Sequence, residues 1–149
     1  MMTSTTTYYS PGIREILKQK RDHINVLIIG NNPIELTNLY TILNNNRAKN
    51  YIAEVCFSVK DSLNRIISRK PDCILIDDNL LVDQIKTFFS KIKSNSRLKN
   101  IPIVLLKSAN FSSEASNEVN DYLLKNNIDS DVLSRTIDKN VKRFKQFIS

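Results

Sequence analysis

Two adjacent carboxylates, those of Asp77 and Asp78, follow directly on a short apolar run at residues 73–76. Four consecutive apolar residues between a Pro-Asp start and a polar end are typical of a strand buried on both faces, because a helix would need greater length. The carboxylates are therefore expected where such a strand leaves the core. In an open parallel sheet flanked by helices, ligands and chemistry collect at that end. The reaction in which Asp77 can take part depends on the side chains that the ends of the other strands place beside it.

Five strand-like runs alternate with helix-like segments along the chain. Asn32 and Pro33 supply an N-cap and a first helical residue, and apolar residues recur at helical spacing after them. The polar segment 107–120 predicts at most a short or weak helix. The alternation indicates an α/β domain whose parallel sheet is covered on both faces. The strand-like runs cover residues 24–29, 51–58, 73–76, 101–106 and 122–124, and the main helical patterns begin near residues 33, 59, 81 and 129.

Length and composition indicate one globular domain. The 149 residues can bury a sizeable core, and 41% hydrophobic with 25% charged residues is ordinary for a soluble chain. No apolar run approaches the roughly 20 residues of a membrane span and the chain begins without a signal peptide, so we expect a cytoplasmic protein. Cys56 and Cys73 are expected to be buried thiols without a disulfide or metal. The basic residues behind the net charge of +7 are dispersed, which favours a solvated surface over nucleic-acid binding.

Residues 1–23 are predicted to form an N-terminal extension to the main domain at 24–149. Ser10 and Pro11 can start a short helix, and Ile13, Ile16 and Leu17 follow at helical spacing with basic residues between and after them. We expect this short basic amphipathic helix to dock on the domain or on a partner.

Three motifs give the chain a resemblance to the receiver domain of two-component response regulators. These are PDCILID at residues 71–77, IPIVLL at 101–106 and DYLLK at 121–125, in the order and at about the spacing of that family. The resemblance covers about residues 24–147. It implies the flavodoxin-like (βα)5 fold, a doubly wound parallel sheet with strand order 2-1-3-4-5, in which several strand ends converge on one pocket.

The resemblance also implies a site for phosphoryl transfer from a histidine kinase. Asp77 would be the phosphoacceptor, and Lys125 would contact the phosphoryl oxygens. Asp77 and the backbone carbonyl of Asn79 would help to hold a divalent cation, for which Mg²⁺ is the expected species because carboxylate, carbonyl and water oxygens suit a hard ion.

The chain departs from the family at two of the strand ends. Gly30 and Asn31 stand where the family carries two metal-holding acids, so that Asn31 offers only an uncharged amide oxygen and a weak metal ligand. Lys107 stands at the usual threonine or serine position, with Ser108 one residue later.

These departures change the expected charge of the pocket. A usual receiver pocket, with three carboxylates and one lysine, carries about −2 and attracts a divalent cation. Asp77 with Lys107 and Lys125 would give +1 if both lysines point inward and Asp78 points away. We therefore hypothesise that one of the lysines pairs directly with Asp77, replaces the metal and lowers the pKa of the carboxyl group. Phosphorylation would then be slow or lost.

Simpler roles for these residues stay open. Asp77 could be a loop or N-cap carboxylate, and Lys125 could extend its ammonium group to solvent from a strand end. Asp78 is expected on the other side of the strand, solvated or capping the next helix. His23, the one histidine of the chain, precedes the first strand and is assigned no catalytic role.

The predicted function is that of a stand-alone receiver, without an output domain after it, in two-component phosphorelay signalling. The departures favour a pseudo-receiver that acts through protein–protein interaction and is not an enzyme beyond, at most, self-catalysed phosphoryl acceptance. One alternative is a fully phosphorylatable receiver, and another is a basic nucleic-acid-binding module. The expected partners are a histidine kinase or phosphotransfer protein and a downstream signalling protein, with a homodimer possible and no membrane contact. The 18 residues from Lys107 to Lys125 are about one helical turn shorter than a common family spacing. The helix between the fourth and fifth strands, which is helix 4 of the family, should therefore be shortened.

Overall fold

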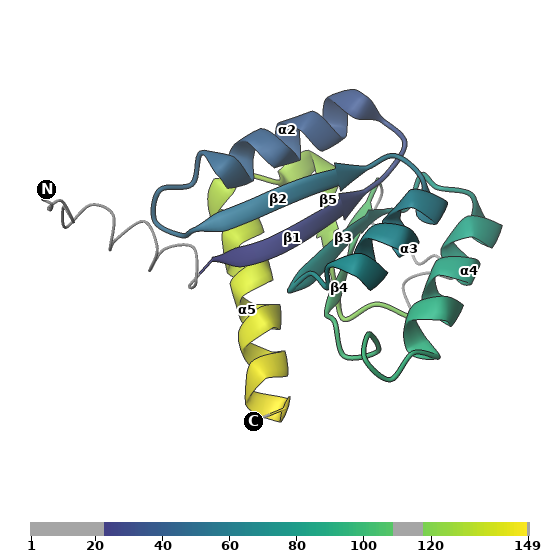
Figure 1. The fold of residues 1–149 in the computed structure, drawn as a ribbon. Coiled ribbons are helices and arrows are strands. Elements are labelled where there is room, and N and C mark those ends of the chain that lie inside the picture. The colour runs from purple at the N-terminus through teal and green to yellow at the C-terminus, as the bar shows by residue number, and fades with distance from the viewer. Residues whose placement is uncertain (1–22, 109–117, 149) are drawn as a thin grey trace, which may run out of the picture.

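The computed structural model describes residues 23–108 and 118–148, which form a five-stranded sheet with helices on both faces (Figure 1). The expected N-terminal helix and the expected short helix between the fourth and fifth strands fall mainly on residues outside these ranges. The strands are β1 (Ile24–Ile29), β2 (Tyr51–Cys56), β3 (Cys73–Asp77), β4 (Ile103–Lys107) and β5 (Asp121–Leu124). The helices are α2 (Pro33–Asn44), α3 (Val59–Ser68), α4 (Val82–Lys93), the 3-10 turn η2 (Lys125–Asn127) and α5 (Ser130–Ile148).

All strand pairs are parallel, in the order β2-β1-β3-β4-β5. This confirms the predicted flavodoxin-like strand order. Parallel strands bring their carboxyl ends to one edge of the sheet, so Asp77 and the residues that follow β1, β4 and β5 lie at that edge. His23 precedes β1 and therefore lies at the opposite end of the sheet from Asp77.

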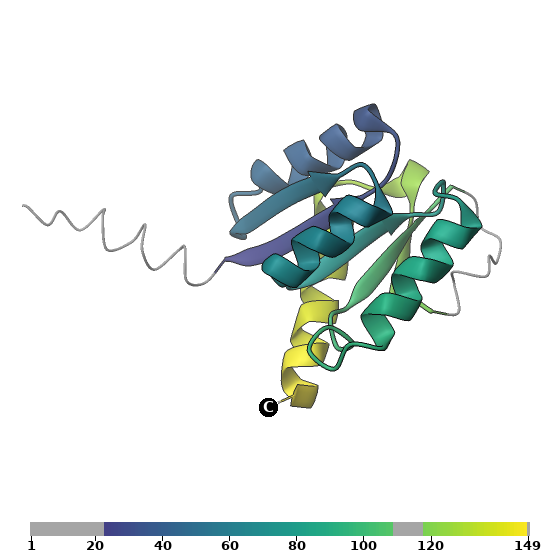
Figure 2. The same cartoon turned by 45° about the vertical axis from the view of Figure 1, so that its right-hand side comes forward.

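Alternate residues of each strand pack into two separate cores. Ile74 and Ile76 face α3 and α4, whereas Cys73 and Leu75 face α2 and α5. Figure 2 shows α3 and α4 in front of the sheet, with α5 on its far side. Because side chains alternate along a strand, Asp77 shares the face of Cys73 and Leu75 and lies on the α2 and α5 side.

Local capping fixes where α2 begins. The side chain of Asn32 accepts hydrogen bonds from the backbone N–H groups of Ile34 and Glu35, and Pro33 is the first helical residue, as predicted. The third helical residue is therefore Glu35, whose position at the sheet's carboxyl edge matters for the site. By contrast, α4 begins without a side-chain cap, so the suggestion that Asp78 caps it is wrong.

The thiols of Cys56 and Cys73 are free and buried on strands that are not neighbours. Burial raises the pKa of the Cys73 thiol to about 12, so this group stays protonated at neutral pH. None of the described helices is long and apolar enough to cross a membrane.

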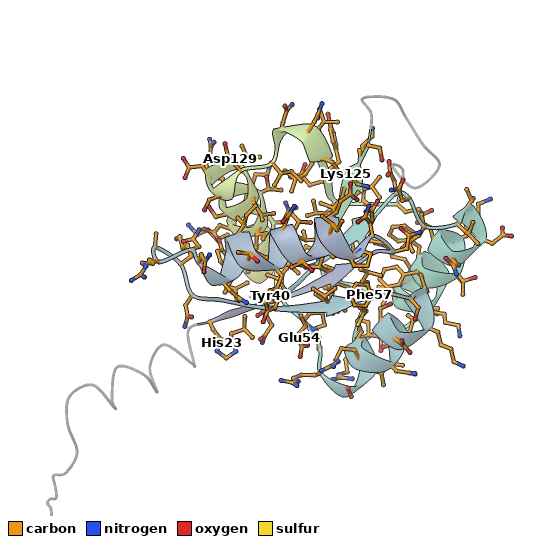
Figure 3. The ribbon with its side chains drawn as sticks, turned by 90° about the horizontal axis from the view of Figure 1, so that it is seen from above. His23, Tyr40, Glu54, Phe57, Lys125 and Asp129 are labelled. Carbon is orange, nitrogen blue, oxygen red and sulfur yellow. The ribbon has the colours of Figure 1, made fainter. Side chains whose placement is uncertain are left out.

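Within the described ranges, strand β2 pairs with β1 alone and forms one edge of the sheet. Its Glu54 side chain accepts a hydrogen bond from Arg65 Nη1 at 2.9 Å and lies 3.7 Å from Arg69 Nη2 (Figure 3). Ile52 on the same strand is 40% exposed. The edge strand thus carries one exposed apolar side chain beside a cluster of charges.

Candidate functional site

Asp77 ends β3 with a carboxylate that is almost entirely buried, its side chain being 1% exposed. Its Oδ1 lies 2.5 Å from Lys125 Nζ and accepts a hydrogen bond of 2.8 Å from the backbone N–H of Asn79. Its Oδ2 is also buried and has no hydrogen-bond partner among the described residues. The carboxylate is therefore bound on one oxygen and unpartnered on the other.

Lys125, labelled in Figure 3, comes directly after β5, and its ammonium group reaches Asp77 although β4 separates β5 from β3. Its Nζ lies 3.3 Å from Glu35 Oε1 and 4.0 Å from Asp78 Oδ1 as well as 2.5 Å from Asp77. Burial alone would lower the pKa of Lys125, but its bond and charge interaction with Asp77 and Glu35 outweigh burial and raise it. The lysine is therefore held as an ammonium group among carboxylates.

Burial raises the pKa of Asp77 above its ordinary value, and the bonds from Lys125 and the Asn79 N–H offset this only in part. The predicted pairing with a lysine is present, but the predicted lowering of the Asp77 pKa is wrong. The physical reason is that the cost of removing the carboxylate from water exceeds what one ammonium group and one amide return.

Lys107 lies on the opposite face of the sheet from Asp77. Leu106 is the β4 residue in register with Asp77, so the next side chain along β4 projects to the α3 and α4 side. There Lys107 Nζ lies 4.8 Å from the centre of the Tyr122 ring, in a cation–π arrangement, with the residue only 6% exposed. The assumption that both lysines point inward, and with it the expected pocket charge of +1, is therefore wrong.

Ser108 binds Asp78 and makes no described bond to Asp77. Its backbone N–H and its Oγ donate to the two oxygens of the Asp78 carboxylate at 3.1 and 2.9 Å. Asp78 is thus neither freely solvated nor a helix cap, because it joins the ends of β3 and β4. With Lys125 Nζ at 4.0 Å, it also adds negative charge to the site.

Glu35 is a site residue that the sequence reading missed. It lies four residues before the buried Leu39, and the two therefore share one side of α2, so the helical pattern held a signal that could have found it. Its carboxylate reaches Lys125 from the helix rather than from a strand end. Three carboxylates and one lysine gather here, and their formal charges sum to −2.

The end of β1 supplies no acid as a ligand for a magnesium ion, although the site as a whole has the charge of −2 that would attract a divalent cation, and Asn31 and Asn79 meet there. Asn31 Nδ2 lies 3.5 Å from the Asn79 carbonyl oxygen and donates to it, so a hydrogen-bond donor faces the expected metal ligand. A Cβ on Gly30 would come within 3.1 Å of Asp77 Cβ, which shows how closely the backbone approaches the carboxylate. Across residues 23–108 and 118–148, no three acidic, histidine or cysteine side chains are grouped so as to hold a metal.

A groove of about 420 Å³ opens beside the ion pairs, between α2 and the segment that follows β5. Asn38, Thr41 and Ile42 line it from α2, and Ile128 lines it from the connection to α5. Asp77, Glu35 and Lys125 lie at its charged end.

Comparisons with known proteins agree with this fold. The sequence matches no protein family model and no curated protein. A putative response regulator from Chloroflexus aurantiacus has a TM-score of 0.71 at 21% identity, with 80% of this chain and 98% of that chain covered. The receiver domain of a sensor histidine kinase from Pseudomonas aeruginosa, with a magnesium ion coordinated in its active site cleft, has a TM-score of 0.71 at 18% identity and the same coverage. The Vibrio cholerae chemotaxis protein CheY4 has a TM-score of 0.67 at 20% identity, with 78% and 98% covered.

The chain therefore has the fold of response regulator receiver domains, as its three sequence motifs predicted.

Proposed function

We propose that this domain is an atypical receiver in two-component signalling that acts by binding other proteins and does not depend on phosphorylation of Asp77. One observation carries the proposal: the Asp77 carboxylate is 1% exposed and already bound to the Lys125 ammonium group. A phosphoacceptor must present an oxygen to the phosphorus atom of its donor in line with the leaving group. Oδ1 is taken and Oδ2 is buried beside Gly30.

The surroundings of Asp77 support the same reading. Phosphoryl transfer is catalysed mainly by positioning and by charges that stabilise the transferring group, and a divalent cation supplies much of that stabilisation. The acid pair that would hold such a cation is replaced by Gly30 and Asn31, and the Asn31 amide donates toward the expected carbonyl ligand. Among the residues that the structure describes, Lys125 is then the one cation beside Asp77, and it already bonds to two close carboxylates.

The proposed partners are those of the two-component pathway: a histidine kinase or phosphotransfer protein, and a downstream signalling protein. The similar structures include both a response regulator and the receiver of a sensor histidine kinase. The alternative, a phosphorylatable receiver, is favoured by one observation, the direct meeting of Asp77 and Lys125 from two strand ends.

A phosphodonor experiment separates the two. The purified chain is incubated with Mg²⁺ and acetyl phosphate, and its intact mass is followed over time, with Asp77→Asn as the control and a phosphorylatable receiver as the positive sample. We expect no phosphoryl adduct on the wild-type chain. An adduct that forms readily and is absent from Asp77→Asn would establish the alternative.

A gain-of-function variant sharpens the result. Asn31→Asp restores one acid at the end of β1 without placing a Cβ at Gly30, where it would meet Asp77. If the missing acids limit phosphorylation, Asn31→Asp should label faster than the wild-type chain. Equal rapid labelling of both would show that the acids are not what limits the reaction.

A further inference from the structure

The groove between α2 and the segment after β5 has the size and lining of a small-molecule site. Its volume of about 420 Å³ lies within the roughly 300–1,000 Å³ of typical ligand pockets. Leu39, Ile42, Leu106 and Ile128 supply apolar surface, and Asn38 and Thr41 supply polar groups on α2. Such a lining suits a ligand with a short apolar body and one polar head.

The charges at one end of the groove decide the sign of that head. Lys125 Nζ bonds to two carboxylates at 2.5 and 3.3 Å and lies 4.0 Å from a third, so acids already offset its charge. The local formal charge of the three carboxylates and the lysine is −2, so this end of the groove repels an anion. The head that complements this end is a cation.

Glu35 is the carboxylate that such a head can reach. Its side chain is 40% exposed, whereas Asp77 is buried, and both line the groove. A primary ammonium group can share Glu35 with Lys125 and leave the Asp77 bond intact. Charge-assisted hydrogen bonds of this kind are about twice as strong as neutral ones.

We propose that this groove binds a small organic cation, a primary ammonium group on a short apolar body, with the head on Glu35 and the body against Leu39, Ile42 and Ile128. The site is separate from phosphorylation, because its head group meets Glu35 and not the buried oxygens of Asp77. If the groove does not bind such a cation, the proposed receiver function still stands. Evidence against the receiver function would likewise leave cation binding in the groove standing.

Three probes with the same apolar body test the sign of the head: hexylammonium, hexanol and hexanoate. Each is titrated into the ¹⁵N-labelled full chain, and amide shifts are followed by NMR. We expect saturable shifts with hexylammonium, gathered on α2 and on residues 125–128, weaker shifts with hexanol and none with hexanoate. Tighter binding of hexanoate, equal binding of all three, or no saturable shifts at these residues would overturn the proposal.

Matched variants test the role of Glu35. Glu35→Gln keeps the shape and removes the charge, and loss of one charge-assisted bond should weaken hexylammonium binding about tenfold. Glu118→Gln removes an equivalent charge from an exposed position outside the groove lining and should change nothing. Thr41→Lys, at an exposed position on the groove wall, should also weaken binding by adding a cation. Unchanged affinity in both Glu35→Gln and Thr41→Lys would refute the assignment, and the spectra of the free variants report on their folding.

Discussion

Replacing Lys125 by methionine tests what holds the buried carboxylate of Asp77. Methionine keeps most of the side-chain length and removes the ammonium group 2.5 Å from Oδ1, which leaves the Asn79 N–H as the remaining described donor to Asp77. Removing one partner of a buried ion pair typically costs about 3–5 kcal/mol. The lower end applies because the Lys125 side chain is 15% exposed and water can reach it. We expect the free energy of unfolding to fall by about 3 kcal/mol.

A double-mutant cycle with Asp77→Asn separates this charge effect from lost packing. The neutral amide leaves no buried charge for Lys125 to compensate, so Lys125→Met should cost much less in the Asp77→Asn background. We expect a coupling energy of about 2 kcal/mol, from urea denaturation of the four chains at neutral pH followed by circular dichroism. Lys99→Met, at an exposed position, is the matched control and should have little effect.

The pH dependence of the same variant adds a second check. Without Lys125, Asp77 should take up a proton in the folded state at higher pH, so the destabilisation by Lys125→Met should shrink as the pH falls. A coupling energy below about 0.5 kcal/mol would refute the reasoning, because the two residues would then act independently. If the destabilisation by Lys125→Met stays constant with pH, this would also count against the interaction of Lys125 with the Asp77 carboxylate.

Two further predictions follow from the same site. The raised pKa of Asp77 means that the folded chain binds more protons than the unfolded chain between the ordinary value of 3.8 and the folded value. The free energy of unfolding should therefore fall as the pH rises through that window, and thermal unfolding from about pH 4 to about pH 7 should show this loss for the wild-type chain and not for Asp77→Asn. Gly30→Ala should destabilise the fold by about 1–2 kcal/mol in urea, because its Cβ would lie 3.0 Å from Leu36 Cδ2 and 3.1 Å from Asp77 Cβ. An unchanged free energy of unfolding in Gly30→Ala would show that the end of β3 can move away from residue 30.

The meeting of Asp77 and Lys125 was predictable from the sequence. Each follows an apolar run of a parallel strand, and the carboxyl ends of parallel strands meet at one edge. The strand order was implied by the resemblance to the receiver family, which rests on three motifs in order. The position of each strand end depends on the order and length of the apolar runs, which the sequence states directly.

Lys107 shows what the order of runs could not decide. Being at a strand end places a residue at the edge of the sheet, but the face on which it lies depends on strand register, and a shift of one residue reverses it. The pairing of Asp77 with Leu106 puts Lys107 on the other face, over Tyr122. Strand register results from how both cores pack together, and the residues of one strand do not determine it.

Glu35 and the Asp77 pKa were missed for different reasons. Glu35 lies in the first turn of α2, whereas the site residues were expected at strand ends, although Asn32 and Pro33 marked the start of this helix. The pKa direction depends on the balance between burial and pairing, and the extent of burial follows from how closely Gly30 and Leu36 pack around the carboxylate. That balance is set by the folded structure alone.

The charged cluster on β2 has a consequence for how the domain behaves at high concentration. An edge strand exposes a row of backbone donors and acceptors that can pair with another chain and lead to aggregation. Glu54 and its two arginines place fixed charges beside that row, next to the exposed Ile52. Edge-to-edge pairing of two such domains would remove these charges from water, so the cluster disfavours aggregation through this strand.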